Sequence, residues 1–361
     1  MLPINATFAV GLLVCSMVFS QACRVEAVGD EKATPEFQAI SLTPAPGWVS
    51  SGVFSLEGTE VLLVDALRRT ILRYDLNGNY LGAFPSVQPN KMPIKRLALS
   101  GGHYLAQGVK QDESETLYLL SHNFSVLRTV NLAQASSGVL DSFFQWVEVG
   151  SDEIIAVADI NLADGTSNTK LVHVTVGERF GVRDLGWPEF FGQIKYAYLL
   201  GLPLLAGGTG QAFFVHDPPP GKGRMSLFAV EKPEALPNGG YASYLDLLKE
   251  PEEEVPPEVR FAALESRSML SGLHLHEGRL YGLLRDVQQS GQNPHWLLMQ
   301  LFPPCMASVP VPSHATHMTL VPGNERLGLL EKGPVTGHGM QNISGIKMVE
   351  WEALERNLGC R

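Results

Sequence analysis

The chain has 361 residues, a formal net charge of −10 and 45% hydrophobic residues. This length and composition allow one large domain, or two smaller ones, with a sizeable core. The negative charge would repel polyanions, so it argues against nucleic acid and acidic membrane surfaces as partners, and leaves neutral or cationic ligands and divalent cations open.

The first residues predict a secretory signal peptide. Residues 1–22 carry no charged side chain, contain an apolar segment at 8–19, and end in Ser20-Gln21-Ala22, a pattern of small residues that suits signal peptidase. A lipid anchor at Cys23, directly after this pattern, is the alternative. The apolar segment of about 12 residues is shorter than the roughly 20 that span a bilayer, so we expect no transmembrane span. We therefore expect a secreted or periplasmic protein, with residues 23–36 as a flexible tether.

Residues 61–82 contain the unit that we expect the chain to repeat. The short apolar run Val61–Val64, closed by Asp65, is typical of a strand covered on both faces. A second run, rich in β-forming residues, follows at 71–76, and Asn77-Gly78 supplies residues that accept positive φ in a tight hairpin. The stretch therefore predicts two antiparallel hairpins in tandem.

The spacing of five residues in this stretch resembles one blade of the NHL-type and TolB-like six-bladed β-propellers. In that family a strand ends in Asp, and an aliphatic residue, an aromatic residue, a glycine and a second aromatic residue follow at fixed distances. The matching residues here are Asp65, Ile71, Tyr74, Gly78 and Tyr80. The resemblance implies an all-β fold in which four-stranded blades surround a central channel.

Six segments of the chain share one plan, namely a first strand, a turn, an apolar second strand that ends in a polar residue, a loop and a third strand. The second strands end at Asp65, Gln107, Asp159, Asp217, Asp286 and Glu331. The sixth segment lacks a fourth strand, and residues 37–42 would supply it, so that the N-terminal strand closes the ring beside the last blade. We predict a six-bladed β-propeller over residues 37–361, with a Pro- and Glu-rich insertion at 231–258.

Three cysteines remain after signal cleavage, which in an oxidising compartment suggests one disulfide and one leftover thiol. The blade alignment places Cys305 and Cys360 just past the third strands of neighbouring blades, on one face, so we expect these two to pair. Two unpaired buried thiols are the alternative.

The polar residues that end the second strands would ring the upper end of the channel. Five of them are carboxylates, Asp65, Asp159, Asp217, Asp286 and Glu331. Carboxylates in a ring suit a hard cation such as Ca²⁺, and no other cofactor is expected. Alternatively, each carboxylate accepts backbone N–H bonds in its own turn and only fixes that loop.

Other chemically active side chains stand at the same end of the predicted channel. His314 and His317 enter the sixth inner strand, and Trp48, Lys95 and Lys195 stand at the starts of other inner strands, where they would line the mouth as ligand-binding residues. Ordinary surface positions are the alternative for all five.

Two further histidines, His274 and His276, lie two residues apart on the fifth inner strand. Side chains at this spacing point to one face of a sheet and could share a metal. Because no carboxylate or cysteine stands nearby at a recognised ligand spacing, histidines without a metal are the favoured interpretation.

The sequence favours a propeller that binds a small ligand or a protein partner at its upper face. One alternative is a metal-assisted hydrolase resembling the lactonase or strictosidine synthase-like propellers, which would need carboxylates and amides on the inner strands. Another is a structural scaffold in an envelope assembly. Fold alone does not choose among them, because propellers serve all three roles.

Overall fold

The computed structural model of the chain describes residues 35–360 with several gaps. Residues 66, 85–92, 101, 110–114, 151, 162, 164, 177–179, 186–204, 217–225, 231–267, 288–294, 306 and 336–340 lie outside the described residues, as do 1–34 and 361. The predicted signal peptide, most of the tether, Cys23 and the insertion at 231–258 therefore fall outside them, and so do Asp217 and Lys195.

Within the described part of the chain, the strands form six antiparallel sheets, five of four strands and one of three. The first strands are β2 (Val49–Phe54), β6 (Ile94–Ser100), β10 (Leu140–Gly150), β14 (Leu205–Gly208), β17 (Met269–His276) and β21 (His317–Pro322). The second strands are β3 (Glu60–Asp65), β7 (His103–Val109), β11 (Glu153–Asn161), β15 (Gln211–His216), β18 (Arg279–Asp286) and β22 (Arg326–Val335). The third strands are β4 (Thr70–Asp75), β8 (Glu115–Leu120), β12 (Ser167–Thr175), β16 (Ser226–Ala229), β19 (His295–Phe302) and β23 (Gln341–Glu350). The fourth strands are β5 (Tyr80–Phe84), β9 (Val126–Asn131), β13 (Gly181–Asp184), β20 (Ser308–Val311) and, from the N-terminus, β1 (Gln38–Ile40).

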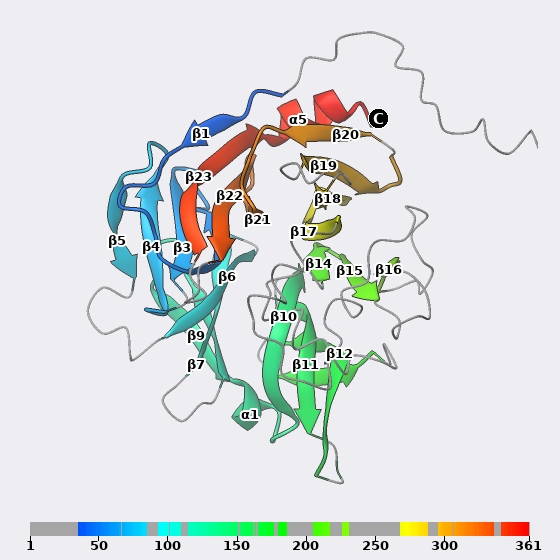
Figure 1. Ribbon diagram of the computed structural model, residues 1–361. Helices are drawn as coiled ribbons and strands as arrows, with labels where there is room; N and C mark the ends of the chain where they lie inside the picture. Colours follow the sequence, from blue (N-terminus) through cyan, green and yellow to red (C-terminus); the bar gives the residue numbers. More distant parts are fainter. Residues whose placement is uncertain are drawn as a thin grey trace, which may run out of the picture. The chain divides into compact units, whose positions relative to one another are not determined.

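The first strands form the centre of a ring. Each contacts the next in the order β2, β6, β10, β14, β17 and β21, and β21 returns to β2. Figure 1 shows the sheets following one another around this centre in chain order. The chain is therefore a six-bladed β-propeller, as the sequence predicts.

The N-terminal strand closes the ring. Strand β1 pairs antiparallel with β23, with Gln38 opposite Met348 and Ile40 opposite Ile346. It thus becomes the outer strand of the last blade, and in Figure 1 the blue and red strands run side by side. The prediction that residues 37–42 complete the sixth blade is confirmed, and this pairing covers an edge of β23 that would otherwise be open.

The hydrophobic core lies between adjacent blades. Residues Val61–Val64 of β3 are fully buried, because one face of their sheet packs on blade 2 and the other on blade 6. Leu62 and Val64 join a cluster with Leu97, whereas Val61 and Leu63 join a cluster with Leu330. An unbroken apolar run therefore marks a strand with no solvent-facing side.

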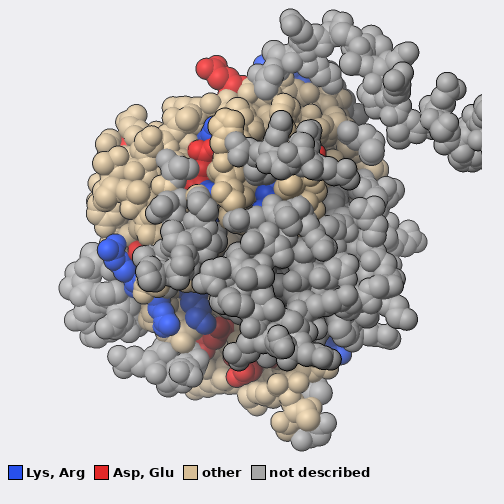
Figure 2. Space-filling model, in the orientation of Figure 1, with Lys and Arg blue, Asp and Glu red and all other residues tan. Residues whose placement is uncertain are grey.

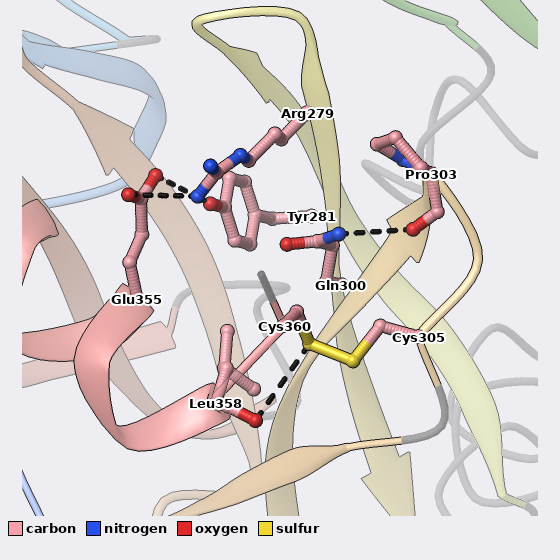
Figure 3. The surroundings of a disulfide bond; sticks show 8 residues. All are labelled: Arg279, Tyr281, Gln300, Pro303, Cys305, Glu355, Leu358 and Cys360. Carbon is pink, nitrogen blue, oxygen red and sulfur yellow. Dashed lines mark hydrogen bonds and ion pairs between the residues drawn. A yellow bond between two sulfur atoms is a disulfide. The ribbon is translucent and has the colours of Figure 1, made fainter.

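The C-terminus fastens blades 5 and 6 together. Helix α5 (Trp351–Leu358) follows β23 directly and buries Leu354 and Leu358 in the core shared by these blades. A short helix, α1 (Leu132–Ala135), links β9 to β10 elsewhere in the ring. Beyond α5, Cys360 is bonded to Cys305 of the loop after β19, with Cα atoms 5.9 Å apart (Figure 3). The pair is the one that the blade alignment predicts.

The two histidines of β17 pack against this helix. The ring of Trp351 lies 4.2 Å from that of His276 and 5.5 Å from that of His274, centroid to centroid. Burial lowers the pKa of His274 to about 3, and burial also lowers the pKa of His276. Both rings lie on one face of the strand, as their spacing predicts, and their surroundings favour the neutral form.

Candidate functional site

One face of the ring collects the residues that the sequence singles out. The first strands begin there and the second strands end there, as the pairs Val49 with Asp65 and His317 with Lys332 show. We call this the upper face, and the opposite one, which holds the turns between first and second strands, the lower face.

Asp65 is used within its own loop. Its side chain is 3% exposed, and Oδ1 accepts hydrogen bonds from the backbone N–H groups of Leu67 (2.9 Å) and Arg68 (2.8 Å). The second carboxylate oxygen lies 3.7 Å from the Arg68 guanidinium. This is the loop-fixing arrangement that an aspartate at a strand end favours, and it occupies the carboxylate.

Three other carboxylates at the upper face accept a hydroxyl hydrogen bond from the same blade. The pairs are Thr169 to Asp159 (2.5 Å), Ser268 to Asp286 (2.7 Å) and Ser313 to Glu331 (2.5 Å). Glu331 also lies 3.5 Å from the ammonium of Lys347. Each carboxylate therefore helps to hold the loops of its own blade. Asp159 and Glu331 precede the ends of β11 and β22, so they do not end these strands as the sequence suggests.

A buried carboxylate that the sequence analysis missed, Glu115, joins blades 2 and 3. Its side chain accepts a hydrogen bond from the Lys95 ammonium (3.0 Å), from the amide of Gln107 (2.9 Å) and from the backbone N–H of Phe143 (2.8 Å). Three donors offset the cost of burying a charge in a residue only 5% exposed. Lys95, a predicted mouth residue on β6, is thus anchored by β8, which lies beyond β7 in the same blade.

Gln107 continues this network into blade 3. It is 1% exposed, and its Oε1 accepts a hydrogen bond from the indole N–H of Trp146 (2.9 Å) while its amide donates to the Phe143 carbonyl (3.2 Å). The Arg96 guanidinium stands 5.5 Å from the centre of the Trp146 ring. The polar residue near the end of β7 therefore fixes the first strand of the next blade.

Lys332 makes a similar contact between blades 6 and 1. It is 9% exposed, and its ammonium donates to the carbonyl of Val49 at the start of β2 (3.2 Å). Burial lowers its pKa to about 8, because removal from water disfavours the charged form. The sequence gives no signal for this role, since Lys332 resembles any polar residue near a strand end.

The starts of β2 and β6 lie together on the upper face. The hydroxyl of Ser50 donates to the carbonyl of Lys95 (2.8 Å), and the backbone N–H of Ile94 donates to the carbonyl of Arg69 (2.8 Å). Trp48, two residues before Ser50, is 39% exposed. The loop after β3 and the starts of both strands therefore meet at one place.

We call Trp48, Arg68, Lys95 and Lys332 the upper cluster. The side chains of Arg68 and Lys95 are 75% and 35% exposed, whereas Lys332 is buried. Of the predicted mouth residues, Trp48 and Lys95 lie at the starts of β2 and β6, which the hydrogen bond from Ser50 to the Lys95 carbonyl joins. His314 is exposed at blade 6, and His317 is half-buried and pairs across the strands with Lys332.

Charged side chains of the described residues mostly lie near a partner of opposite sign. Figure 2 shows blue and red side chains close to one another on the face turned to the viewer. In the described ranges no group of three or more His, Cys, Asp or Glu is placed to hold a metal ion. Nor does any helix of those ranges have the length and apolar character to cross a membrane.

The chain matches no protein-family model and no curated protein. Among solved structures it is similar to a luciferin-regenerating enzyme, with 10% identity over 87% of this chain and 95% of that one and a TM-score of 0.46. It is also similar to a gluconolactonase from Xanthomonas campestris (10% identity, 88% and 90% coverage, TM-score 0.47). A calcium-binding protein, regucalcin, from Agrobacterium tumefaciens gives 12% identity, 87% and 95% coverage and a TM-score of 0.44. At such low identity and TM-score, these likenesses carry no argument about activity.

Proposed function

We propose that this chain is an exported β-propeller that binds a ligand or a protein partner through its upper face. The observation that carries the proposal is the exposure of Trp48 and of Arg68 at neighbouring places on the upper face, since Val49, which follows Trp48, pairs with Asp65 at the start of the loop that holds Arg68. Tryptophan and arginine are the side chains most often responsible for binding energy at interfaces. The neighbouring carboxylates Asp65 and Glu115 are already engaged by internal hydrogen bonds.

The chemistry of the upper cluster suits a group that carries both a carboxylate and an apolar surface. Arg68 supplies the positive charge, because its side chain is 75% exposed and its guanidinium lies only at 3.7 Å from one oxygen of Asp65, and Trp48 supplies the apolar surface. The Lys95 ammonium is already paired with Glu115. The net charge of −10 still opposes extended polyanions, because they would reach beyond this local cluster. A single carboxylate on a small molecule, or on the side chain of a partner, would avoid that repulsion.

Export is supported by two independent features. The uncharged N-terminal segment suits a secretory signal, and the bond between Cys305 and Cys360 suits an oxidising compartment. Mass spectrometry of the mature protein tests this proposal. An N-terminus at Cys23 is expected, either free or carrying a lipid, whereas an intact Met1 in the exported fraction would contradict it.

Binding is tested on the mature, oxidised protein with benzoate, indole-3-acetate and succinate as probes, by calorimetry. At least one aromatic carboxylate should bind saturably in the millimolar range or below. Trp48→Ala and Arg68→Ala should each weaken that binding by about tenfold, as expected for central contact residues. Leu127→Ala, at an exposed apolar position on the outer strand β9, is the matched control and should leave it unchanged. Failure of all three probes, or equal binding by Trp48→Ala, would contradict the proposal.

The alternative function is that of a metal-assisted hydrolase, and metal analysis distinguishes it from ligand binding alone. The purified mature protein is assayed for bound cations and for a shift in melting temperature with Ca²⁺. A stoichiometric cation together with a calcium-dependent shift would favour the hydrolase and place Asp159, Asp286 or Glu331 among its ligands. Neither is expected if these carboxylates only hold their loops.

A further inference from the structure

A second concave site lies on the lower face, between blades 1 and 2. It is a pocket of about 250 Å³, and the residues that line it include Glu57, Glu60, Arg73, Tyr104, His122 and Phe124. The volume is just below the range of about 300–1,000 Å³ for sites that bind drug-sized ligands, so it suits a smaller molecule. The pocket lies away from the upper cluster, so it requires an explanation of its own.

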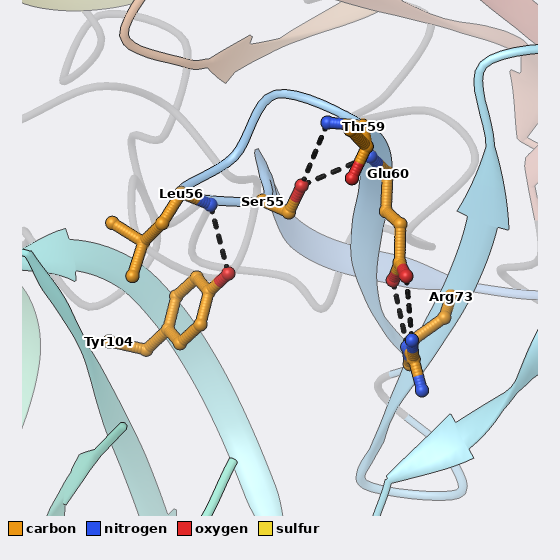
Figure 4. Close-up of polar contacts among 6 residues, drawn as sticks. All are labelled: Ser55, Leu56, Thr59, Glu60, Arg73 and Tyr104. Carbon is orange, nitrogen blue, oxygen red and sulfur yellow. Dashed lines mark hydrogen bonds and ion pairs between the residues drawn. The ribbon is translucent and has the colours of Figure 1, made fainter. Parts of the chain in front are cut away.

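The turn between β2 and β3 gives the pocket a fixed wall. The hydroxyl oxygen of Ser55 accepts hydrogen bonds from the backbone N–H groups of Thr59 (3.1 Å) and Glu60 (3.0 Å). The Glu60 carboxylate in turn accepts two hydrogen bonds from the Arg73 guanidinium, at 2.8 and 2.6 Å. Figure 4 shows the bonded pair on one side of this turn and Tyr104 on the other. A wall held in this way does not need to be ordered by a ligand.

Tyr104 brings a directed donor to the pocket. Its ring is 1% exposed and stacks on Phe124 with centroids 5.1 Å apart. The phenol oxygen accepts a hydrogen bond from the backbone N–H of Leu56 (3.0 Å), and among the described residues its own O–H meets no acceptor. Burial raises the pKa of Tyr104, so the phenol stays protonated at neutral pH and keeps this donor.

Charge limits the kind of ligand that the pocket can take. The ion pair between Glu60 and Arg73 is neutral as a unit, and the exposed carboxylate of Glu57 adds one negative charge. Anions are therefore disfavoured, since Glu57 would repel them. A simple amine would be attracted by Glu57, but it offers no acceptor to the Tyr104 hydroxyl or to the remaining N–H groups of Arg73.

We propose that this pocket binds a neutral polyhydroxylated molecule of monosaccharide size. Each hydroxyl group both donates and accepts, so one can donate to Glu57 while another accepts from Tyr104 or from the remaining N–H groups of Arg73. The apolar face of the sugar ring contacts the edge of Phe124. The source of the sugar ring is either a free monosaccharide or the terminal unit of a longer glycan, which present the same chemistry.

The test uses the mature, oxidised protein and two kinds of sugar, with saturation-transfer NMR and calorimetry as readouts. The panel comprises glucose, galactose, mannose and xylose as free sugars, maltose and cellobiose as longer glycans, and ethanolamine and acetate as charged probes. At least one sugar should bind saturably with a Kd below about 10 mM. Tighter binding of a disaccharide identifies a glycan end as the natural ligand, and equal or weaker binding identifies a free sugar.

Variants assign the binding to this pocket. Glu57→Ala and Tyr104→Phe should each weaken sugar binding by about tenfold, which is the scale of one lost hydrogen bond to a buried or charged group. Glu352→Ala removes another exposed carboxylate, from helix α5, and should have no effect. Because Tyr104→Phe leaves the Leu56 N–H without its acceptor, its melting temperature is measured as well, and Thr59→Trp serves as a second variant that fills the pocket from an exposed position.

Three results would overturn the proposal. They are no saturable sugar binding below about 10 mM, binding of the charged probes in place of the sugars, and sugar binding that Glu57→Ala and Thr59→Trp leave unchanged. Trp48→Ala should not alter sugar binding, so the upper-face proposal and this one can fail separately.

Discussion

The two ends of the chain both fasten the last blade, but they do so by different physical means. At the N-terminus, β1 adds backbone hydrogen bonds to β23, and Thr43 then pairs with the hairpin of blade 1 through the Gly78 carbonyl (2.8 Å) and the Tyr80 N–H (3.1 Å). At the C-terminus, helix α5 packs its side chains into the core, and a disulfide holds it there. One closure depends on backbone fit, and the other on a covalent bond and on aromatic packing.

This difference predicts different sensitivities. Backbone pairing at the N-terminus tolerates changes of redox state and pH, but it does not tolerate an added atom where two backbones touch. The C-terminal closure is sensitive to reduction, and through His274 and His276 it is sensitive to acid. Three measurements test this contrast.

The largest effect is expected from loss of the disulfide. Cys360→Ser opens a link between residues 55 positions apart, and the chain-entropy relation gives a loss of about 4 kcal/mol in the free energy of unfolding. Chemical denaturation of the oxidised protein measures it. Cys305→Ser and the double variant should lose the same amount, because each removes the same bond. Single variants as stable as the wild type would show that α5 needs no covalent anchor.

A smaller effect is expected at the N-terminal closure. A Cβ atom at Gly78 would lie 2.0 Å from the backbone oxygen of Ser41, and φ at this residue is +84°. Gly78→Ala should therefore lower the free energy of unfolding by about 2–3 kcal/mol, by strain and by displacing the segment that follows β1. Chemical denaturation measures this loss as well.

The matched control for this variant is Gly102→Ala. Gly102 has a similar φ of +90°, but nothing lies within 4 Å of the position that an alanine methyl group would take. Only the conformational cost of about 1 kcal/mol is expected there. Equal losses in both variants would mean that the contact between Gly78 and Ser41 contributes nothing to closure.

The smallest effect is expected from acid. The pKa of His274 is lowered in the folded protein, so the unfolded chain binds protons more readily, and stability present above pH 6.5 is lost as the pH falls towards 3. Desolvation also lowers the pKa of His276, against an opposing effect of Glu277 and Glu355 and with a further lowering by Arg279. Between pH 6.5 and 4.5 the wild type should lose about 2 kcal/mol more than His274→Phe, a variant that keeps an aromatic ring against Trp351. Parallel pH profiles from denaturation experiments would contradict this assignment.

Much of the fold could be predicted from the sequence, because its signals are local. The apolar run Val61–Val64, the Asn77-Gly78 turn and the missing fourth strand of the last segment indicate the blade plan and the ring closure. The point at which β23 ends and helix α5 begins, between Glu350 and Trp351, carries no such local signal. The limit of a strand is harder to predict, since the indole is buried equally well at the end of a strand or the start of a helix.

The candidate sites were harder to predict than the blades. The Asp65 carboxylate accepts hydrogen bonds from the backbone of its own loop, as the local sequence pattern predicts. No local pattern predicts the contacts of Glu115 and Lys332. Their roles depend on neighbouring blades, and so does the lower pocket around Tyr104. Asp217 and Lys195 lie outside the described residues, so their predicted place at the mouth stays a prediction.

By itself the sequence determined the number of blades, the strand that seals the ring and the two cysteines that face each other, because strand period and turn chemistry act over a few residues. Only the tertiary structure decided which partner each polar side chain takes. Lys332 donates a hydrogen bond to the carbonyl of Val49, which is 283 positions away in the chain. No local sequence pattern predicts this contact, because it exists only once the ring has closed. Burial then decides the chemistry, since it determines which charges are paired internally and which remain for a ligand.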